Sequence, residues 1–139
     1  MNEVIYIMLV DQSDADARTT MKAVRRAAPS ASVLRVKDGE QALRFLFRRG
    51  LFTREPQLPR LILLDLTVPI ISGRRVLERV RTDATTNDIP VIVLTSLPDA
   101  RAVRESFALG AQAFVAKSAA ACEYVYEVSN HISTWLRSA

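Results

Sequence analysis

The stretch that most constrains the fold is an apolar run that contains one aspartate, Asp65, and lies between Pro59 and Pro69. Five of the six residues from Leu61 to Leu66 are large aliphatics, which is typical of a strand buried on both faces of a parallel sheet. An ionised carboxylate is costly there unless it is paired, so we expect Asp65 at the strand end, where a crevice opens. The alternative is an ordinary capping or turn aspartate before a proline.

Four further apolar segments also end in polar residues, and helix-compatible stretches separate them. Strands are predicted over residues 4–10, 31–36, 61–66, 89–94 and 111–116. Helices are predicted over 14–27, 99–109 and 119–136. A further helix begins at the cap Asp38 and ends at Gly50, and another begins at the cap Ser72 and ends before the polar loop 83–88. This alternation predicts an α/β fold, a doubly wound parallel sheet of five strands with helices on both faces.

Apolar residues at three-to-four spacing predict which helix faces are buried. For the first three helices these are Ala17, Met21, Val24 and Ala28; Ala42, Leu43, Leu46 and Phe47; and Val76, Leu77 and Val80. In the last helix we expect Cys122, Val125, Ser129 and Ile132 to face the sheet, which leaves a second stripe of Tyr124, Val128, His131 and Trp135. That stripe predicts a homodimer through the fourth and fifth helices; alternatively, Trp135 folds back over the core of a monomer. His131 is expected to have no catalytic role.

With 139 residues, 49% of them hydrophobic, the chain is expected to form a single domain over residues 1–139 without an output domain. The longest apolar run has seven residues, far below the roughly 20 needed to span a bilayer. No leader-like segment opens the sequence, and the lone Cys122 cannot form an internal disulfide. A cytoplasmic protein that does not bind membranes is therefore predicted.

The basic character of the chain comes mainly from arginines. The formal net charge is +4, and of the 19 basic residues only Lys22, Lys37 and Lys117 are lysines. The arginines are spread over several predicted helices, and aromatics make up only 6% of the residues, whereas nucleic-acid binders usually gather both on one face. A solvated basic surface, without direct nucleic-acid binding, is the simpler interpretation.

Four polar residues come at matching places after successive strands. The carboxyl ends of parallel strands meet at one rim, so Asp11, Asp65, Thr95 and Lys117 are expected to converge there. An aspartate can accept a phosphoryl group as an acyl phosphate if the charges of donor and acceptor are neutralised. Mg²⁺ on Asp11 and Asp65, the Lys117 ammonium and the Thr95 hydroxyl would neutralise and bind them. The set predicts phosphoryl transfer onto Asp65.

The chain resembles the response-regulator receiver domains of bacterial two-component signalling. The matching residues are Leu9-Val10-Asp11, Leu63-Leu64-Asp65 with Pro69 and Gly73, Leu94-Thr95-Ser96, and Gly110-Ala111 with Lys117. The resemblance implies a flavodoxin-like (β/α)5 fold with strand order 2-1-3-4-5 and a sensor histidine kinase as the partner. It implies that Asp65 accepts the phosphoryl group, that Thr95 and Lys117 hold it, and that Mg²⁺ lies on Asp11, Asp65 and the backbone carbonyl of Thr67. Phe114 matches an aromatic that such domains reorient on activation.

A narrower resemblance concerns single-domain receivers paired with bacterial phytochrome kinases. It rests on the connection around residues 51–56, on Ile89-Pro90 and on the lack of an output domain. Two departures from the family pattern matter. Gln12 stands where a second acid is usual, so weak Mg²⁺ binding is expected. Ser118 stands where a cis proline is usual, so a trans or strained loop after Lys117 is expected.

Two other classes of function remain open on the sequence. Asp65-Leu66-Thr67-Val68 faintly resembles the nucleophile motif of haloacid-dehalogenase-type phosphatases, but the motif's second Asp is replaced by Thr67 and no cap domain is present. A pseudo-receiver that binds partners without being phosphorylated is compatible with Gln12 and Ser118. The main prediction is a signalling domain that catalyses only its own phosphorylation and dephosphorylation, and is otherwise not an enzyme.

Overall fold

The computed structural model describes residues 5–47, 58–96, 99–117 and 120–138. Five strands in this part of the chain form one parallel sheet in the order β2-β1-β3-β4-β5. They are β1 (Tyr6–Val10), β2 (Ser32–Val36), β3 (Leu61–Asp65), β4 (Val91–Thr95) and β5 (Ala113–Ala116). The doubly wound α/β fold and its predicted strand order are confirmed.

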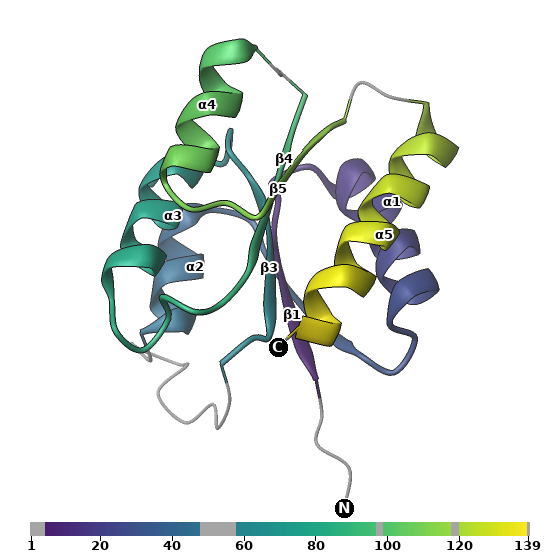
Figure 1. The fold of residues 1–139 in the computed structure, drawn as a ribbon, viewed down its shortest axis with the longest axis horizontal. Coiled ribbons are helices and arrows are strands. Elements are labelled where there is room, and N and C mark those ends of the chain that lie inside the picture. The colour runs from purple at the N-terminus through teal and green to yellow at the C-terminus, as the bar shows by residue number, and fades with distance from the viewer. Residues whose placement is uncertain (1–4, 48–57, 97–98, 118–119, 139) are drawn as a thin grey trace, which may run out of the picture.

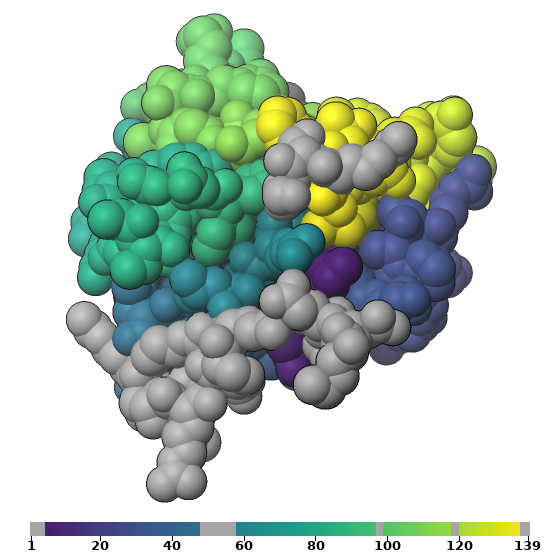
Figure 2. Space-filling view, turned by 60° about the horizontal axis from the view of Figure 1, so that its bottom comes forward, coloured from purple at the N-terminus to yellow at the C-terminus, as the bar shows by residue number. Residues whose placement is uncertain are grey.

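In the described part of the chain, five helices cover the sheet in two layers, with α1 and α5 on one face and α2, α3 and α4 on the other (Figure 1). Their bounds are α1 (Asp14–Ala27), α2 (Gly39–Leu46), α3 (Gly73–Thr82), α4 (Ala100–Ala108) and α5 (Ala121–Ser138). The two layers are also visible in the space-filling view, with α3 and α4 in green on one side and α1 and α5 in blue and yellow on the other (Figure 2). Among the described residues, no helix has both the length and the apolar character needed to cross a membrane.

Polar caps set the starts of the first four helices. The side chains of Ser13, Asp38, Ser72 and Asp99 each accept a hydrogen bond from a backbone N–H three residues later. The predicted end of α2 at Gly50, the connection 51–57 and the loop at Ser118 lie outside the described residues. Gly110 adopts a φ of 97° immediately after Leu109, the C-cap of α4, as expected of a glycine that ends a helix.

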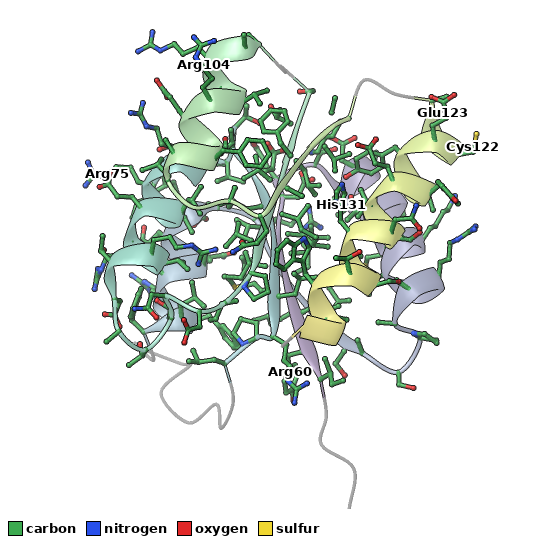
Figure 3. All side chains as sticks on the ribbon, in the orientation of Figure 1. Arg60, Arg75, Arg104, Cys122, Glu123 and His131 are labelled. Atoms are coloured by element: carbon green, nitrogen blue, oxygen red, sulfur yellow. The ribbon has the colours of Figure 1, made fainter. Side chains whose placement is uncertain are left out.

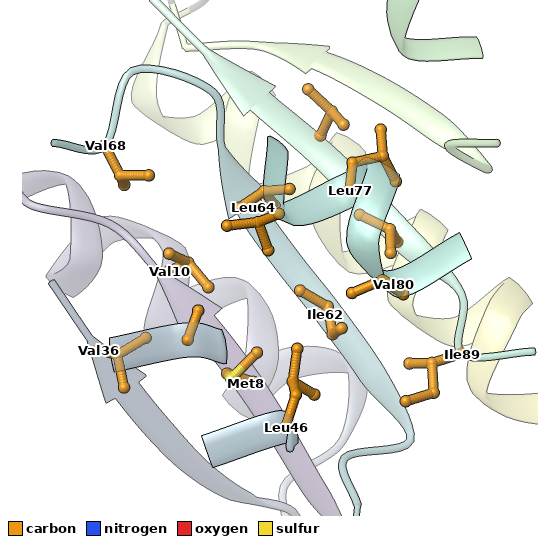
Figure 4. Packing of buried hydrophobic residues seen from close by; sticks show 14 of the residues in the cluster. Met8, Val10, Val36, Leu46, Ile62, Leu64, Val68, Leu77, Val80 and Ile89 are labelled. Atoms are coloured by element: carbon orange, nitrogen blue, oxygen red, sulfur yellow. The ribbon is translucent and has the colours of Figure 1, made fainter. Parts of the chain in front are cut away.

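The core has one apolar cluster on each face of the sheet because alternate residues of a strand point to opposite faces. Met8 and Val10 of β1 join the cluster under α2 and α3, drawn in Figure 4, whereas Ile7 and Leu9 join the cluster under α1 and α5. Every residue of β3 and of β4 is buried. Both strands are therefore buried on two faces, as their apolar sequences predict.

The predicted inward face of α5 is only partly correct. Tyr124 and Val128, which we assigned to an outer stripe, are buried with Ser129 and Ile132, whereas Cys122 is exposed. Trp135 is partly buried and packs against the same cluster, as in the folded-back alternative. The helix is rotated from the predicted orientation because Tyr124 has a buried polar partner on α1. The stripe that suggested a homodimer therefore does not exist as an outer surface.

Smaller differences affect α1 and α2. On α1, Thr20 and Ala23 are buried with Ala17 and Val24, while Met21 and Ala28 are only partly buried. On α2, Phe45 is buried in place of Leu43 and Phe47, which pack at the margin of the cluster. The inward residues of α3 are as predicted: Val76, Leu77 and Val80.

Candidate functional site

Three of the four residues predicted at the carboxyl rim of the sheet are in direct contact. Asp11 directly follows β1, Asp65 is the last residue of β3, and Lys117 directly follows β5. The Lys117 Nζ donates to Oδ2 of Asp11 at 2.6 Å and to Oδ2 of Asp65 at 2.7 Å. Asp65 and Asp11, which lie 52 and 106 positions from Lys117 in the sequence, thus share its buried ammonium.

The ammonium has a third carboxylate partner, Asp16, whose Oδ2 lies 3.1 Å from Nζ. Burial raises the pKa of the Asp11 carboxyl, against the hydrogen bond and charge of Lys117, which lower it. Burial also lowers the pKa of the Lys117 ammonium. The hydrogen bonds and charges of Asp11 and Asp65 together outweigh that effect, so the Lys117 pKa lies above its usual value. Lys117 is therefore a fixed positive charge at neutral pH.

The loop after β3 holds the other oxygen of Asp65. Oδ1 accepts hydrogen bonds from the backbone N–H of Thr67 at 2.9 Å and from its hydroxyl at 2.8 Å. Gly73, the first residue of α3, packs against this turn so closely that a Cβ there would lie 2.6 Å from the backbone oxygen of Asp65. The carboxylate of Asp65 is thus oriented from both sides.

The position of Asp11 is fixed in a similar way. Its Oδ1 accepts from the backbone N–H of Ser13 at 2.9 Å, and its carbonyl oxygen accepts from Arg35 Nε at 2.9 Å. Arg35 also pairs with the exposed Asp14 at 2.8 Å. The three-residue connection from β1 to α1 is therefore tied to the end of β2.

A hollow of about 360 Å³ opens over these groups. Its lining residues are Asp11, Gln12, Ser13, Asp16, Asp65, Thr67 and Ser96. Three of them, Ser13, Asp16 and Ser96, were not predicted as site residues from the sequence. The signal for Asp16 was its place in the first turn of the helix after Asp11, which puts it near the same rim.

The remaining predicted residues lie close to this hollow. Thr95 ends β4 and is 2% exposed, and its carbonyl oxygen accepts a hydrogen bond from the Lys117 N–H at 2.7 Å. A role of its hydroxyl in holding a phosphoryl group stays a prediction. Phe114 is half-buried on β5 and packs against the cluster under α2 and α3. His131 is half-buried on α5, with no hydrogen bond to the residues of the hollow among those that the structure describes.

The donor atoms at the hollow suit a hard divalent cation. Carboxylate, amide and carbonyl oxygens of Asp11, Asp65, Gln12 and Thr67 are ligands of the kind that Mg²⁺ prefers. No three His, Cys, Asp or Glu side chains within the described ranges are already arranged as a metal-binding group. The residues therefore fit an ion that has few protein ligands and keeps several of its waters.

Three surface arginines and the single cysteine lie away from this site. Arg60, Arg75 and Arg104 are at separate parts of the surface, and Cys122 projects outward near the start of α5 (Figure 3). The labelled arginines do not form one basic face, in keeping with the distribution in the sequence.

Comparisons with known proteins agree with this geometry. The family model described as the response regulator receiver domain matches residues 7–128. Response regulator Rcp1 of Synechocystis sp. (strain ATCC 27184 / PCC 6803 / Kazusa) is 31% identical over 132 residues, which is 95% of this chain and 89% of Rcp1. The solved structure of the phosphorylated cyanobacterial phytochrome response regulator RcpA is 31% identical, with a TM-score of 0.89 and coverage of 99% of this chain and 97% of RcpA. The solved structure of the Mn²⁺-bound form of Rcp1 is 30% identical, with a TM-score of 0.87 and coverage of 97% of this chain and 96% of the Rcp1 chain.

Proposed function

The chain belongs to the response regulator receiver domain family, and from that premise we propose that it accepts a phosphoryl group from a sensor histidine kinase on Asp65. The observation that carries the proposal is the buried contact of 2.7 Å between Asp65 and the Lys117 ammonium, beside Asp11 at the rim of the sheet. A carboxylate oxygen of Asp65 forms the new bond to phosphorus. The bond from phosphorus to the donor nitrogen breaks, and that nitrogen keeps the electron pair.

Each residue of the site has a proposed role in this step. Lys117 neutralises an oxygen of the incoming phosphoryl group, and the Thr95 hydroxyl binds another. Thr67 orients the carboxylate through its two hydrogen bonds to Oδ1. Asp11, Asp65 and the Thr67 carbonyl would hold Mg²⁺. When bound, the ion supplies neutralisation of the negative charge that builds up as donor and acceptor approach.

We also propose the biological setting of this domain. The similarity to Rcp1 and RcpA supports a bacterial phytochrome as the kinase partner. We propose a single-domain cytoplasmic regulator that signals by protein contact and does not bind nucleic acid. A homodimer through α4 and α5 stays a prediction, now without the outer stripe on α5. Sedimentation equilibrium with and without beryllofluoride would test it, and a monomer in both conditions would remove it.

Labelling with a small phosphodonor tests the proposed function. With phosphoramidate and Mg²⁺, intact-mass analysis should show one added phosphoryl group on the wild-type chain and none on Asp65→Asn. Asp88→Asn, which changes an exposed carboxylate, should be labelled like wild type. A wild-type chain that stays unlabelled while it binds its partner would support the alternative, a pseudo-receiver, for which the loss of an acid at Gln12 is the favouring observation.

A further inference from the structure

The contact between Asp16 and Lys117 has no assigned role in the proposed phosphoryl transfer. Asp16 lies in the first turn of α1, and its Oδ2 is 3.1 Å from the Lys117 Nζ. An ammonium has three N–H donors. In this structure Asp11, Asp65 and Asp16 provide one acceptor oxygen each, so the hydrogen-bonding capacity of Lys117 is filled.

Lys117 and an incoming divalent cation would compete for the same carboxylates. Oδ2 of Asp11 and Oδ2 of Asp65 both contact the ammonium, within 2.7 Å. A cation on these two side chains repels the ammonium and takes part of its hydrogen bonding. Because the Lys117 side chain is 7% exposed, an ammonium left without a carboxylate partner there would be costly.

Asp16 is placed to remain the partner of Lys117 in that situation. It lines the hollow over Asp11 and Asp65 and also a neighbouring pocket of about 140 Å³, whose other lining residues are Thr19, Lys117, Ala121 and Tyr124. Lys117 therefore has open space on the Asp16 side of the acidic pair. Three carboxylates and one ammonium carry a formal charge of −3 + 1 = −2, which one divalent cation balances.

We propose that Asp16 is a positioning residue: it holds the Lys117 ammonium when a divalent cation occupies Asp11 and Asp65, and so makes room for the ion without leaving a buried charge unpaired. The inference rests on the proposed function, because it gives that site its cation. It also assigns a role to a carboxylate outside the four residues singled out at the rim. Gln12 is neutral and adds no negative charge to the site. The carboxylate of Asp16 helps to balance the charge of the cation in its place.

Mn²⁺ titration of the intact chain, followed by the electron paramagnetic resonance signal of the free ion, tests the proposal without any phosphodonor. Asp16→Asn should weaken Mn²⁺ binding by roughly two- to fivefold, the range expected for a partly exposed ion pair. Asp14→Asn removes the same charge from the same helical turn but from a carboxylate paired with Arg35 and Lys37. It should leave the affinity within about 1.5-fold of wild type, given the screening of exposed charges. Asp16→Glu, which keeps the charge, should retain most of the affinity.

A second background shows whether Asp16 acts through Lys117. Lys117→Met removes the competing ammonium, so Asp16→Asn in that background should cause no larger loss than Asp14→Asn does. An undiminished effect of Asp16→Asn in Lys117→Met would mean that Asp16 acts on the ion directly, and would overturn the proposal. Equal effects of Asp16→Asn and Asp14→Asn in the wild-type background, an Asp16→Glu variant as weak as Asp16→Asn, or a wild-type chain that binds no Mn²⁺ would also overturn it.

The two proposals fail in different measurements. Labelling of Asp65 by phosphoramidate decides the proposed function, whereas the Mn²⁺ titration decides the role of Asp16. A chain that is labelled on Asp65 but shows no specific effect of Asp16→Asn keeps the first proposal and loses the second. Thermal unfolding of each variant, followed by circular dichroism, ensures that affinities are compared between folded proteins.

Discussion

The hydroxyl of Tyr124 on α5 lies 2.8 Å from the hydroxyl of Thr20 on α1, and both side chains are buried. The pair joins the two helices that cover one face of the sheet. It also explains the orientation of α5, because a buried Tyr hydroxyl needs a partner and Thr20 provides it. Burial raises the pKa of Tyr124 to about 12, although the Thr20 hydrogen bond acts in the opposite direction.

Replacing this hydroxyl should change how stability depends on pH. Because the folded pKa of Tyr124 lies above its unfolded value of about 10, the neutral Tyr stabilises the fold fully below pH 10. This contribution is lost as the pH rises through about 12. Tyr124→Phe should therefore lose less stability than wild type between pH 9 and pH 11.5. At pH 7 it should be about 1–2 kcal/mol less stable, since the Thr20 hydroxyl loses its buried partner.

Urea unfolding at pH 7, 9, 10.5 and 11.5 measures both effects. The pKa of Lys117 is also raised in the folded protein, so its contribution to stability also falls at alkaline pH, in wild type and variant alike. Tyr126→Phe is the matched control, because Tyr126 is 56% exposed and contacts Arg26 through its ring. Parallel pH curves for Tyr124→Phe and wild type would show that Tyr124 ionises normally.

Restoring an acid at position 12 should strengthen cation binding. Gln12 is exposed and lines the hollow over Asp11 and Asp65, so Gln12→Asp adds a carboxylate where a cation is expected. We expect several-fold tighter Mg²⁺ binding by isothermal titration calorimetry. Asn130→Asp, which adds the same charge on an exposed position of α5, should have little effect. Unchanged or weaker binding in Gln12→Asp would mean that residue 12 does not face the ion.

Gly73 should not tolerate a side chain. Its backbone N–H donates to the carbonyl oxygen of Leu66 at 3.2 Å, and a Cβ would lie 2.6 Å from both the Asp65 oxygen and the Leu66 Cα. These are backbone atoms, so the turn itself must shift, and Gly73→Ala should destabilise the protein by about 2–4 kcal/mol. The rate of Asp65 labelling should fall as well, because the carboxylate moves with the turn. Chemical denaturation and intact-mass kinetics measure the two effects, with the adjacent exposed Arg74→Ala as a control expected near wild type.

The turn after β3 contains a residue in an unfavourable conformation. Ile70 has a φ of 72° and its side chain is largely exposed, and a β-branched residue rarely adopts this left-handed region. Ile70→Asn should stabilise the protein by about 1 kcal/mol, since Asn tolerates the region and little packing is lost. Ile70→Val keeps the branched side chain and should give no such gain. Denaturation midpoints compare the variants, and a less stable Asn variant would show that the Ile70 side chain makes a stabilising contact.

Local sequence patterns determined most of the fold. Uninterrupted apolar runs indicated strands buried on both faces, and the predicted caps Asp38 and Ser72 marked two helix starts that the structure shows. These signals are short-range, because each depends on residues within one or two turns of the same element. The predictions for β3, β4 and α3 needed nothing from the rest of the chain.

The amino-acid sequence alone determined that acids and an amine lie at the carboxyl ends of the first, third and fifth strands, and so that Asp11, Asp65 and Lys117 share one rim. Only the tertiary structure decided which side chains complete that group and which face of α5 is buried. Asp16 meets Lys117 across 101 residues, and Tyr124 meets Thr20 across 104. Such contacts depend on the order of the strands and on how far each helix is rotated over the sheet. Helical spacing by itself allows several rotations, and the buried polar pair between α1 and α5 selects one of them.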